Sequence, residues 1–376
     1  MAVTFSKSLS TTKLLNAYNN NVVEFTSNAI PIGETISKAT INIGGEDVEI
    51  TPINEVFSYN FREIIRVLMN NNFEDSIIAD DGYKADASLS GSYLVTYTLT
   101  FSDATTENTA ETYVFLKSVE QIAGVSERLL TEQHILNQSE LTFFDGYPFD
   151  ISIYSDGDFS VINDDNNNYA EFDGTLGETG RIYLSELDAE GLFRERVEFD
   201  GGVYEGGGCD EADSDGDLLE LGCNNVRVVG GVTDSMTIKL ESVCGGIYLK
   251  WFNRMGGWSY WLFNPIYKEL LKARTMDKFS VDFESIDDTY ETTLITGKDT
   301  EKERGLVYEN LSEAERLQIT DLLSSPRVEM YNGVKDGDLS TWQTVVVKDG
   351  GFEINNTKRC ISNFRATIEI NDYNQN

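Results

Sequence analysis

The chain has 376 residues, of which 40% are hydrophobic and 11% are aromatic. This apolar content is sufficient for folded cores and argues against a disordered chain. The 64 acidic residues against 29 basic ones give a net charge of -35, so that the surface repels phosphate. We therefore expect no nucleic-acid partner and no membrane partner, since both require clusters of Lys and Arg.

The composition favours many strands joined by tight turns, because 31 Gly and only 5 Pro accompany clusters of Asn and Asp between short apolar runs. We predict a mainly β, multidomain fold of β-sandwich-like domains decorated with a few short helices. Segment 1–117 is predicted to be an N-terminal sandwich-like domain with one helix, and 118–145 a connector. Segment 146–376 is a β-rich C-terminal region that divides into the candidate subdomains 146–240 and 241–376.

The first domain contains one strong strand pattern and one helical pattern. Residues 93–101 alternate large apolar side chains with Leu and Thr, which is typical of a strand. Phe57, Phe61, Ile64 and Leu68 follow the spacing of an amphipathic helix that ends in three asparagines at 70–72. Within the connector, segment 127–136 is a candidate short helix.

The C-terminal region begins with an alternating segment, 149–154, which turn-rich sequence follows as far as Asn225. Further strands are predicted at 236–240, 247–251 and 258–263, and the last two flank a Gly256-Gly257 turn as a hairpin. Later strands are predicted at 344–347 and 364–370, with a turn at 348–351 after the first of them.

Two helices are predicted in the last third of the chain. Asn264 and Pro265 supply an N-cap and a first-turn proline for a helix carrying Ile266, Leu270 and Leu271. Ser312 and Glu315 have the spacing of a capping box. They open a second helix, which contains Leu317, Leu322 and Leu323 and stops before Pro326.

Few residues have the pattern of a catalytic site. His134 is the single histidine and provides neither a metal cluster nor a triad by itself, so we expect it to be a surface or interface residue. The phosphate-loop, dinucleotide, nucleophile-elbow and zinc-protease motifs do not occur in the sequence. Four cysteines in a chain of this length do not make a disulfide framework, and we expect free, mostly buried thiols.

One acidic loop has the composition of a calcium site. Glu211, Asp213, Asp215 and Asp217 alternate along it, and Gly216 provides for a sharp turn. The position at which an EF-hand requires a bidentate Glu is occupied by Gly222, so the loop is not an EF-hand. These four residues are candidate calcium ligands, and a solvated acidic loop is the alternative that the pattern favours. No other cofactor is predicted.

The hairpin at 247–263 carries large aromatic side chains on both faces, among them Trp251, Trp258, Tyr260 and Trp261. At least one face must therefore be covered by another layer, a helix or a subunit. These four residues are the candidate binding or interface residues, and Trp258 and Trp261 are possible platforms for a sugar ring.

Several stretches resemble virion structural proteins, of the tail or baseplate, from tailed phages that infect Bacteroidota. The stretches are Leu15–Asn19 with Val23–Phe25, Gly146–Ile151, Leu249–Phe263 and Leu322–Val328. The chain departs from the expected Asn-Pro pair after Tyr18, where it has Asn19-Asn20. The resemblance implies a β-rich tail or baseplate protein that packs into rings or sleeves with other virion proteins, and it supplies no catalytic residues. We expect a homo-oligomer, either a ring or a trimer.

The predicted function is thus that of a virion structural protein, synthesised in the host cytoplasm and released by lysis, in agreement with an N-terminus that lacks the pattern of a secretory signal. A glycan- or receptor-binding tail module is the alternative, with a host glycan as partner. A polysaccharide-cleaving tail enzyme is the weaker alternative, because 64 acidic residues permit a carboxylate pair without selecting one.

Overall fold

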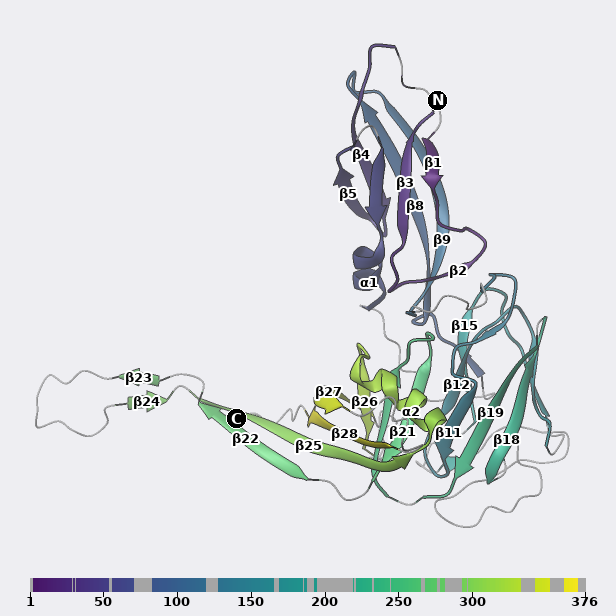
Figure 1. Cartoon of the computed structure of the whole chain (residues 1–376), viewed down its shortest axis with the longest axis vertical. Helices are drawn as coiled ribbons and strands as arrows, with labels where there is room; N and C mark the ends of the chain where they lie inside the picture. The colour runs from purple at the N-terminus through teal and green to yellow at the C-terminus, as the bar shows by residue number, and fades with distance from the viewer. Residues whose placement is uncertain are drawn as a thin grey trace, which may run out of the picture. The chain divides into compact units, whose positions relative to one another are not determined.

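The computed structural model describes most of the chain, in segments of which the longest are 3–28, 32–53, 56–70, 83–119, 128–165, 169–184, 221–231, 233–243, 245–264, 268–275, 297–332, 342–351 and 362–370. Residues 30, 186–187, 193–194, 219, 278–280 and 293–295 are described as well. The chain divides into two compact units, Met1–Ser242 with Phe252–Ser259, and Val243–Trp251 with Tyr260–Asn376. The prediction of a mainly β fold with few helices is confirmed (Figure 1).

The first unit opens with a sandwich of two sheets, with strand orders β1-β3-β6 and β2-β9-β8-β4-β5. Neighbouring strands are antiparallel, except that β2 runs parallel to β9. The elements are β1 (Val3–Lys7), β2 (Leu14–Asn16), β3 (Val22–Ser27), β4 (Ile36–Ile43), β5 (Glu46–Ile50), β6 (Phe57–Asn60), α1 (Arg62–Asn70), β8 (Ser90–Phe101) and β9 (Thr106–Leu116).

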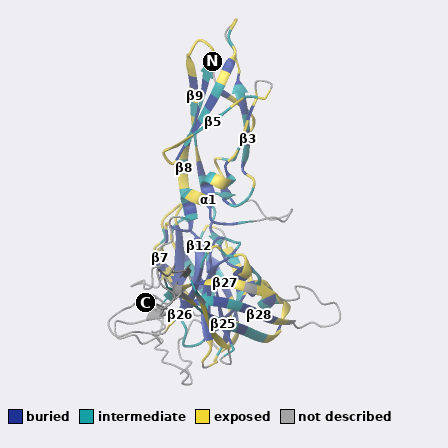
Figure 2. Cartoon of the chain, turned by 90° about the vertical axis from the view of Figure 1, so that its left-hand side faces the viewer, coloured by how far each residue is buried: buried dark blue, intermediate teal, exposed yellow. Residues whose placement is uncertain are grey.

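The strand predicted at 93–101 is confirmed as part of β8. Val95, Tyr97, Leu99 and Phe101 are buried, whereas the residues between them are only half-buried or exposed. Figure 2 shows buried, intermediate and exposed residues following one another along β8 and β9. This alternation follows from the pleat, which directs successive side chains to opposite faces of the sheet.

The helix predicted from Phe57 begins five residues later, at Arg62. Phe57 belongs to β6 instead, where it lies opposite Phe25 of β3, and the two rings stack with their centroids 5.6 Å apart. Phe57 and Phe61 are both fully buried in the core of the sandwich. Because Phe57 and Phe61 are both buried and four residues apart, they match the spacing of a helix. Pairing with β3 nevertheless places Phe57 in a strand.

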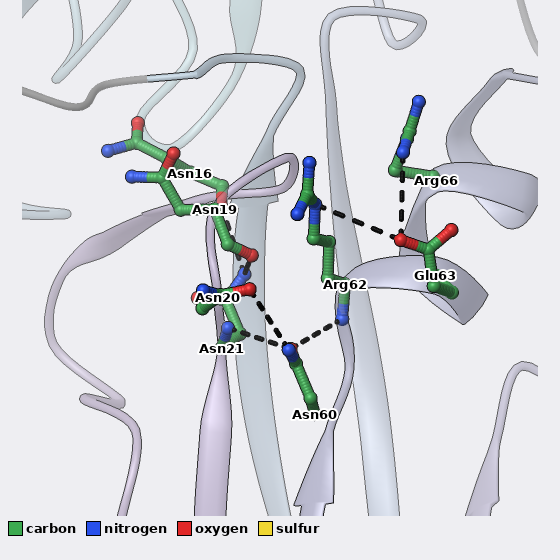
Figure 3. A network of polar contacts seen from close by, with 8 residues as sticks. All are labelled: Asn16, Asn19, Asn20, Asn21, Asn60, Arg62, Glu63 and Arg66. Carbon is green, nitrogen blue, oxygen red and sulfur yellow. Dashed lines mark hydrogen bonds and ion pairs between the residues drawn. The ribbon is translucent and has the colours of Figure 1, made fainter.

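A network of asparagines joins the loop between β2 and β3 to the start of α1 (Figure 3). Oδ1 of Asn60 accepts hydrogen bonds from the backbone N–H groups of Asn21 and Arg62, each at 3.1 Å, and Nδ2 of Asn60 donates to Oδ1 of Asn20. The side chain of Asn21 donates to the carbonyl oxygens of Asn16 and Asn19. Asn60 thereby satisfies a backbone donor in the first turn of α1 and fixes the chain entering β3.

Substituting Asn60 with Ala is expected to lower the free energy of unfolding by about 1 to 2 kcal/mol, because two backbone N–H groups lose their acceptor. Asn60→Asp is the matched control, since it keeps the acceptor and loses only the bond to Asn20. Urea denaturation followed by circular dichroism should therefore rank the wild type, Asn60→Asp and Asn60→Ala in decreasing stability. Equal stability of the two variants would contradict this role for the acceptor.

A second sandwich completes the first unit, with strand orders β10-β12-β15-β7 and β11-β19-β18-β13-β14. Its strands are β7 (Tyr83–Ala85), β10 (His134–Ile135), β11 (Glu140–Phe144), β12 (Asp150–Tyr154), β13 (Phe159–Asn163), β14 (Tyr169–Phe172), β15 (Thr179–Tyr183), β18 (Gly222–Val229) and β19 (Thr233–Glu241). The ring of Tyr83 in one sheet meets Phe159 in the other at 5.3 Å. The ribbon of β16 (Glu186–Leu187) and β17 (Phe193–Arg194) lies between β15 and β18 in the sequence.

Part of the predicted connector is integral to this second sandwich. Both β10 and β11 lie within segment 118–145. β10 pairs with β12, and β11 pairs in parallel with β19, so these two strands belong to the sheets of the sandwich. The short helix predicted at 127–136 is wrong for the described residues, because Leu129 forms a bridge to Lys13 and His134 begins β10. These pairings join segments more than ten residues apart, which local sequence patterns do not reveal.

The second unit is built on one seven-stranded sheet of order β21-β20-β26-β27-β28-β25-β22. Its elements are β20 (Ile247–Phe252), β21 (Trp258–Phe263), β22 (Glu269–Thr275), β25 (Lys298–Leu311), α2 (Glu313–Thr320), the 3-10 helix η1 (Asp321–Leu323), β26 (Val328–Tyr331), β27 (Trp342–Gly351) and β28 (Ser362–Ile370). A ribbon of β23 (Lys278–Ser280) and β24 (Thr293–Ile295) lies between β22 and β25 in the sequence.

The capping-box helix is confirmed as α2. The Ser312 hydroxyl accepts from the backbone of Glu315, and the Glu315 carboxylate accepts from the backbone of Ser312. Its buried residues are Arg316, Gln318 and Ile319, whereas Leu317 is 48% exposed. The amide of Gln318 donates to the backbone carbonyl of Tyr260 at 3.0 Å, which fixes α2 on the sheet.

Two other predictions in this unit are corrected. The helix predicted after Asn264-Pro265 is wrong for its described part, because Leu270 and Leu271 belong to strand β22, which pairs along its length with β25. The turn predicted at 348–351 is also wrong, because β27 continues to Gly351. A bulge between Val347 and Asp349 absorbs Lys348. In both places pairing with a neighbouring strand overrode the local signal.

Candidate assembly surface

The second unit carries a two-stranded arm formed by β22 and β25 (Figure 1). Seven residue pairs join the two strands, from Glu269 opposite Arg304 to Thr275 opposite Lys298. On its other side β25 pairs with β28 only from Lys302 onward. The last four residues of β22 therefore lie beyond the end of β28, and the arm extends past the rest of the sheet.

Strand β22 is an exposed edge of the sheet. Among the described strands it has a neighbour on one side only, which leaves backbone donors and acceptors along its other side. Leu270 is 39% exposed and Leu271 is 74% exposed. The two leucines project to opposite faces, as consecutive residues of a strand do, so the arm has apolar groups on both faces next to an open edge.

The arm is also locally basic in a strongly acidic protein. Segment 268–278 contains four basic residues, Lys268, Lys272, Arg274 and Lys278, against two acidic ones. Its net charge of +2 contrasts with -35 for the chain. Exposed leucines, an open edge and opposite charge together are features of a surface that binds a partner strand.

Ion pairs fix the base of the arm to the sheet. Lys272 donates to the carboxylate of Glu303 at 2.6 Å, and Lys348, the residue in the β27 bulge, reaches Glu301, Glu303 and Glu369. The hydrogen bond from Lys272 lowers the pKa of Glu303 from its usual value, and Lys348 lowers it further. The bulge that sequence reasoning took for a turn thus places a cation among three carboxylates.

The four predicted binding or interface residues, Trp251, Trp258, Tyr260 and Trp261, are at most 1% exposed. A sugar platform or a subunit interface requires accessible rings, so these residues are core residues and that prediction is corrected. Every residue of β20 and β21 is buried. The requirement that the hairpin be covered is therefore met, and it is met on both faces.

Aromatic contacts within the second unit surround this hairpin. The ring of Trp261 meets Tyr308 of β25 edge-on at 5.1 Å, and Phe263 lies 5.4 Å from Phe364 of β28. On the opposite face, Tyr248 and Tyr260 stack and both contact Trp342. The face of Tyr248 and Tyr260 also holds a buried cation, Lys250.

Lys250 is 1% exposed and forms an ion pair with Glu329 at 3.1 Å. Its ammonium group lies 4.2 Å from the centre of the Trp342 ring, in the geometry of a cation–π contact. Arg327 also pairs with Glu329, at 2.6 Å. Glu329 thus pairs with two cations inside the fold, and removing its carboxylate would leave Lys250 buried without an ion-pair partner.

A second buried charge cluster lies in the first unit, and sequence reasoning missed it. Arg181 of β15 pairs with Asp150 of β12 at 2.6 Å, with the two side chains 3% and 1% exposed. The Arg181 guanidinium also lies over the rings of Tyr183 and Trp258. Asp86, 1% exposed, accepts from the backbone and hydroxyl of Ser88. Burial raises the pKa of Asp86, and Arg181 opposes that rise.

The other residues singled out in the sequence either lie outside the described residues or take no part in a cluster of functional groups. The candidate calcium ligands Glu211, Asp213, Asp215 and Asp217 lie outside them. Within the described segments, no group of three or more acidic, His or Cys side chains is arranged to hold a metal. His134 is half-buried, with Nε2 3.0 Å from the carbonyl oxygen of Leu129. Cys223 is free and exposed, which corrects the expectation of burial for that thiol.

A pocket of about 490 Å³ lies in the first unit, lined in part by Ser90, Tyr154, Glu178 and Thr179. The hydroxyls of Ser90 and Thr179 are 3.0 Å apart, and Thr179 donates to the carbonyl of Asp86. The Tyr154 hydroxyl donates to the carbonyl of Leu130. The hydroxyl groups of Ser90, Thr179 and Tyr154 thus form hydrogen bonds within the fold.

Comparison with models of protein families gives no match, and comparison with curated proteins gives none either. None of the helices that the structure describes is both long and apolar enough to cross a membrane.

Proposed function

We propose that this chain is a non-enzymatic structural subunit that assembles through its β domains, as a tail or baseplate component of a tailed-phage virion. The observation that carries the proposal is the arm formed by β22 and β25, with its open edge, the exposed Leu271 and a basic charge opposite to that of the whole chain. The place in a tail or baseplate rests on the resemblance of Leu249–Phe263 and the other stretches named above.

The burial of the hairpin aromatics supports the structural role over the glycan-binding alternative. A module that binds a polysaccharide through Trp258 or Trp261 requires accessible rings, and both are at most 1% exposed. The same rings stabilise the fold through contacts with Arg181 and Tyr308. The assembly surface is thus provided by the arm and not by the hairpin.

The test is the solution mass of the purified chain by light scattering at moderate salt. At about 0.15 M salt the Debye length is about 8 Å, so the long-range repulsion between acidic copies is screened while contacts within an interface persist. We expect a discrete oligomer, such as a trimer or a ring. Repeating the measurement with calcium and then with a chelator tests whether the loop at 211–217 holds a cation that assembly needs.

Leu271→Asp is the variant that tests the arm, because it places a charge on the exposed face of β22. We expect it to shift the oligomer to monomer while the chain stays folded, as circular dichroism reports. Leu317→Asp is the matched control, since Leu317 is also exposed but lies on α2; its oligomer should equal that of the wild type. A wild-type chain that stays monomeric at every concentration and salt would overturn the proposal of self-assembly.

A further inference from the structure

The partner of β22 can be identified by the chemistry that its edge requires. A strand that adds to β22 must have an open edge of its own and acidic side chains opposite the basic ones. Among the edge strands that the structure describes, β5 alone has more than one acidic residue, namely Glu46, Asp47 and Glu49, and it has no basic one. β22 is in turn the single described edge strand with two basic residues, Lys272 and Arg274.

Strand β5 has the exposure that such an acceptor needs. It lies at the end of the sheet β2-β9-β8-β4-β5 and pairs with β4 through a tight turn at Gly44 and Gly45. Both glycines have a positive φ, +60° and +87°, which suits the turn that closes a two-residue hairpin. Glu46, Asp47 and Glu49 are all exposed, while Ile50 lies against the core of the sandwich. Glu49 pairs with Lys38 of β4, and Asp47 accepts a hydrogen bond from Asn42, while all three acidic side chains remain exposed.

We propose that β22 of one copy adds to the free edge of β5 in a second copy. This inference rests on the proposed function, because it names the surfaces through which the subunit assembles. Backbone hydrogen bonds between the two edges hold the copies together, and the basic residues around β22 face the carboxylates of β5. The contact joins two different surfaces, so its repetition gives a ring where the rotation closes and a filament where it does not.

Pairing of β22 with β22 of another copy is disfavoured by charge. β22 contains two basic residues and one acidic one, so that self-pairing places two strands of net charge +1 side by side, whereas β5 has a net charge of -3. Self-pairing also uses the same surface twice and ends at a dimer. A closed dimer that is insensitive to changes in β5 would therefore count against the proposed contact.

A charge exchange between the two strands tests the proposal. The first variant carries Glu46→Lys and Asp47→Lys in β5, where Glu49 is left in place because it pairs with Lys38, and the second carries Lys268→Glu and Arg274→Glu around β22. Lys272 is left in place because it donates to Glu303. A third chain combines all four substitutions and restores the net charge of the wild type. Glu171→Lys with Asp173→Lys is the control, because it makes the same charge change in the edge strand β14 and at the residue that follows it.

Each of the first two variants should dissociate with a dissociation constant raised about tenfold or more, since two attractive cross-strand pairs become repulsive. An equimolar mixture of these two variants should co-assemble with the two chains alternating, because β22 of each variant again has the charge opposite to that of β5 in the other. The combined variant should regain the wild-type mass, and the control should never lose it. Light scattering over a concentration series gives these masses, and circular dichroism with thermal midpoints verifies that each variant is folded.

The outcomes separate this inference from the proposed function. A wild-type oligomer that persists in the β5 variant while Leu271→Asp abolishes it would overturn the pairing with β5 and leave the structural role standing. Loss of assembly in both single-strand variants without rescue in the mixture or in the combined chain would also overturn the pairing. A wild-type monomer under all conditions would overturn both proposals.

Discussion

Replacing Arg181 with Met is expected to lower the free energy of unfolding of the first unit by about 3 to 5 kcal/mol. The substitution keeps most of the volume of the side chain and removes the cation between two buried carboxyl groups. Asp150 then loses its ion pair at 2.6 Å, and Asp86 loses the charge that opposes the rise in its pKa. A buried charge without a partner costs far more than an exposed one, because water cannot solvate it.

The free energy of unfolding should depend on pH, and the raised pKa of Asp86 gives the direction of this dependence. Burial raises the pKa of Asp86 above its value in the unfolded chain, so the folded state holds this proton at pH values where the unfolded state has released it. Stability therefore falls as pH rises from about 4 toward the raised pKa. In Arg181→Met this fall should be larger and extend to higher pH, because the opposing guanidinium is gone.

Arg181→Met with Asp86→Asn is the control for this mechanism. Asn at position 86 keeps the oxygen that accepts from Ser88 and removes the titrating group, so the part of the pH dependence that Asp86 contributes should disappear. Urea denaturation at a series of pH values, followed by circular dichroism, measures both effects. A loss in Arg181→Met that is below about 1 kcal/mol, or one that is the same from pH 4 to 8, would contradict the buried charge cluster.

Trp261→Ala is expected to lower the free energy of unfolding of the second unit by about 3 to 5 kcal/mol. The side chain is 0% exposed and lies edge-on to Tyr308 at 5.1 Å, so that its truncation leaves a buried cavity. A cavity loses the contacts of every atom that lined it, in addition to the lost burial of the indole. Trp261→Phe should cost less, because a smaller cavity remains.

Leu271→Ala provides the contrast for this prediction. Leu271 is 74% exposed on the arm, so its truncation should change the free energy of unfolding by at most about 0.5 kcal/mol. Circular dichroism during urea denaturation reports all three variants without relying on tryptophan fluorescence. If Trp261→Ala were as stable as Leu271→Ala, the assignment of this tryptophan to the core would be wrong, and the accessible platform predicted from sequence would regain support.

The candidate site shows where sequence reasoning succeeded and where it failed. The alternation and the Gly256-Gly257 turn predicted the hairpin of β20 and β21 correctly. Large apolar residues on both faces of the hairpin also predicted that at least one face is covered, but only the structure decided that both faces are, and that Trp251 and Trp261 are therefore core residues. The arm was missed because Asn264 and Pro265 are typical of a helix start, whereas pairing with β25 makes the next described segment a strand.

By itself the sequence determined the elements whose signals are local. The period-two patterns at 93–101, 236–240 and 364–370 became parts of β8, β19 and β28, and the capping box at Ser312 closed as predicted, since each depends on side chains only a few residues apart. The tertiary structure alone decided that Phe57 lies in a strand, that β22 ends the sheet among the described strands, and that Arg181 meets Asp150. Those outcomes depend on which distant strands pair, and pairing is settled by the burial and hydrogen bonding of whole sheets.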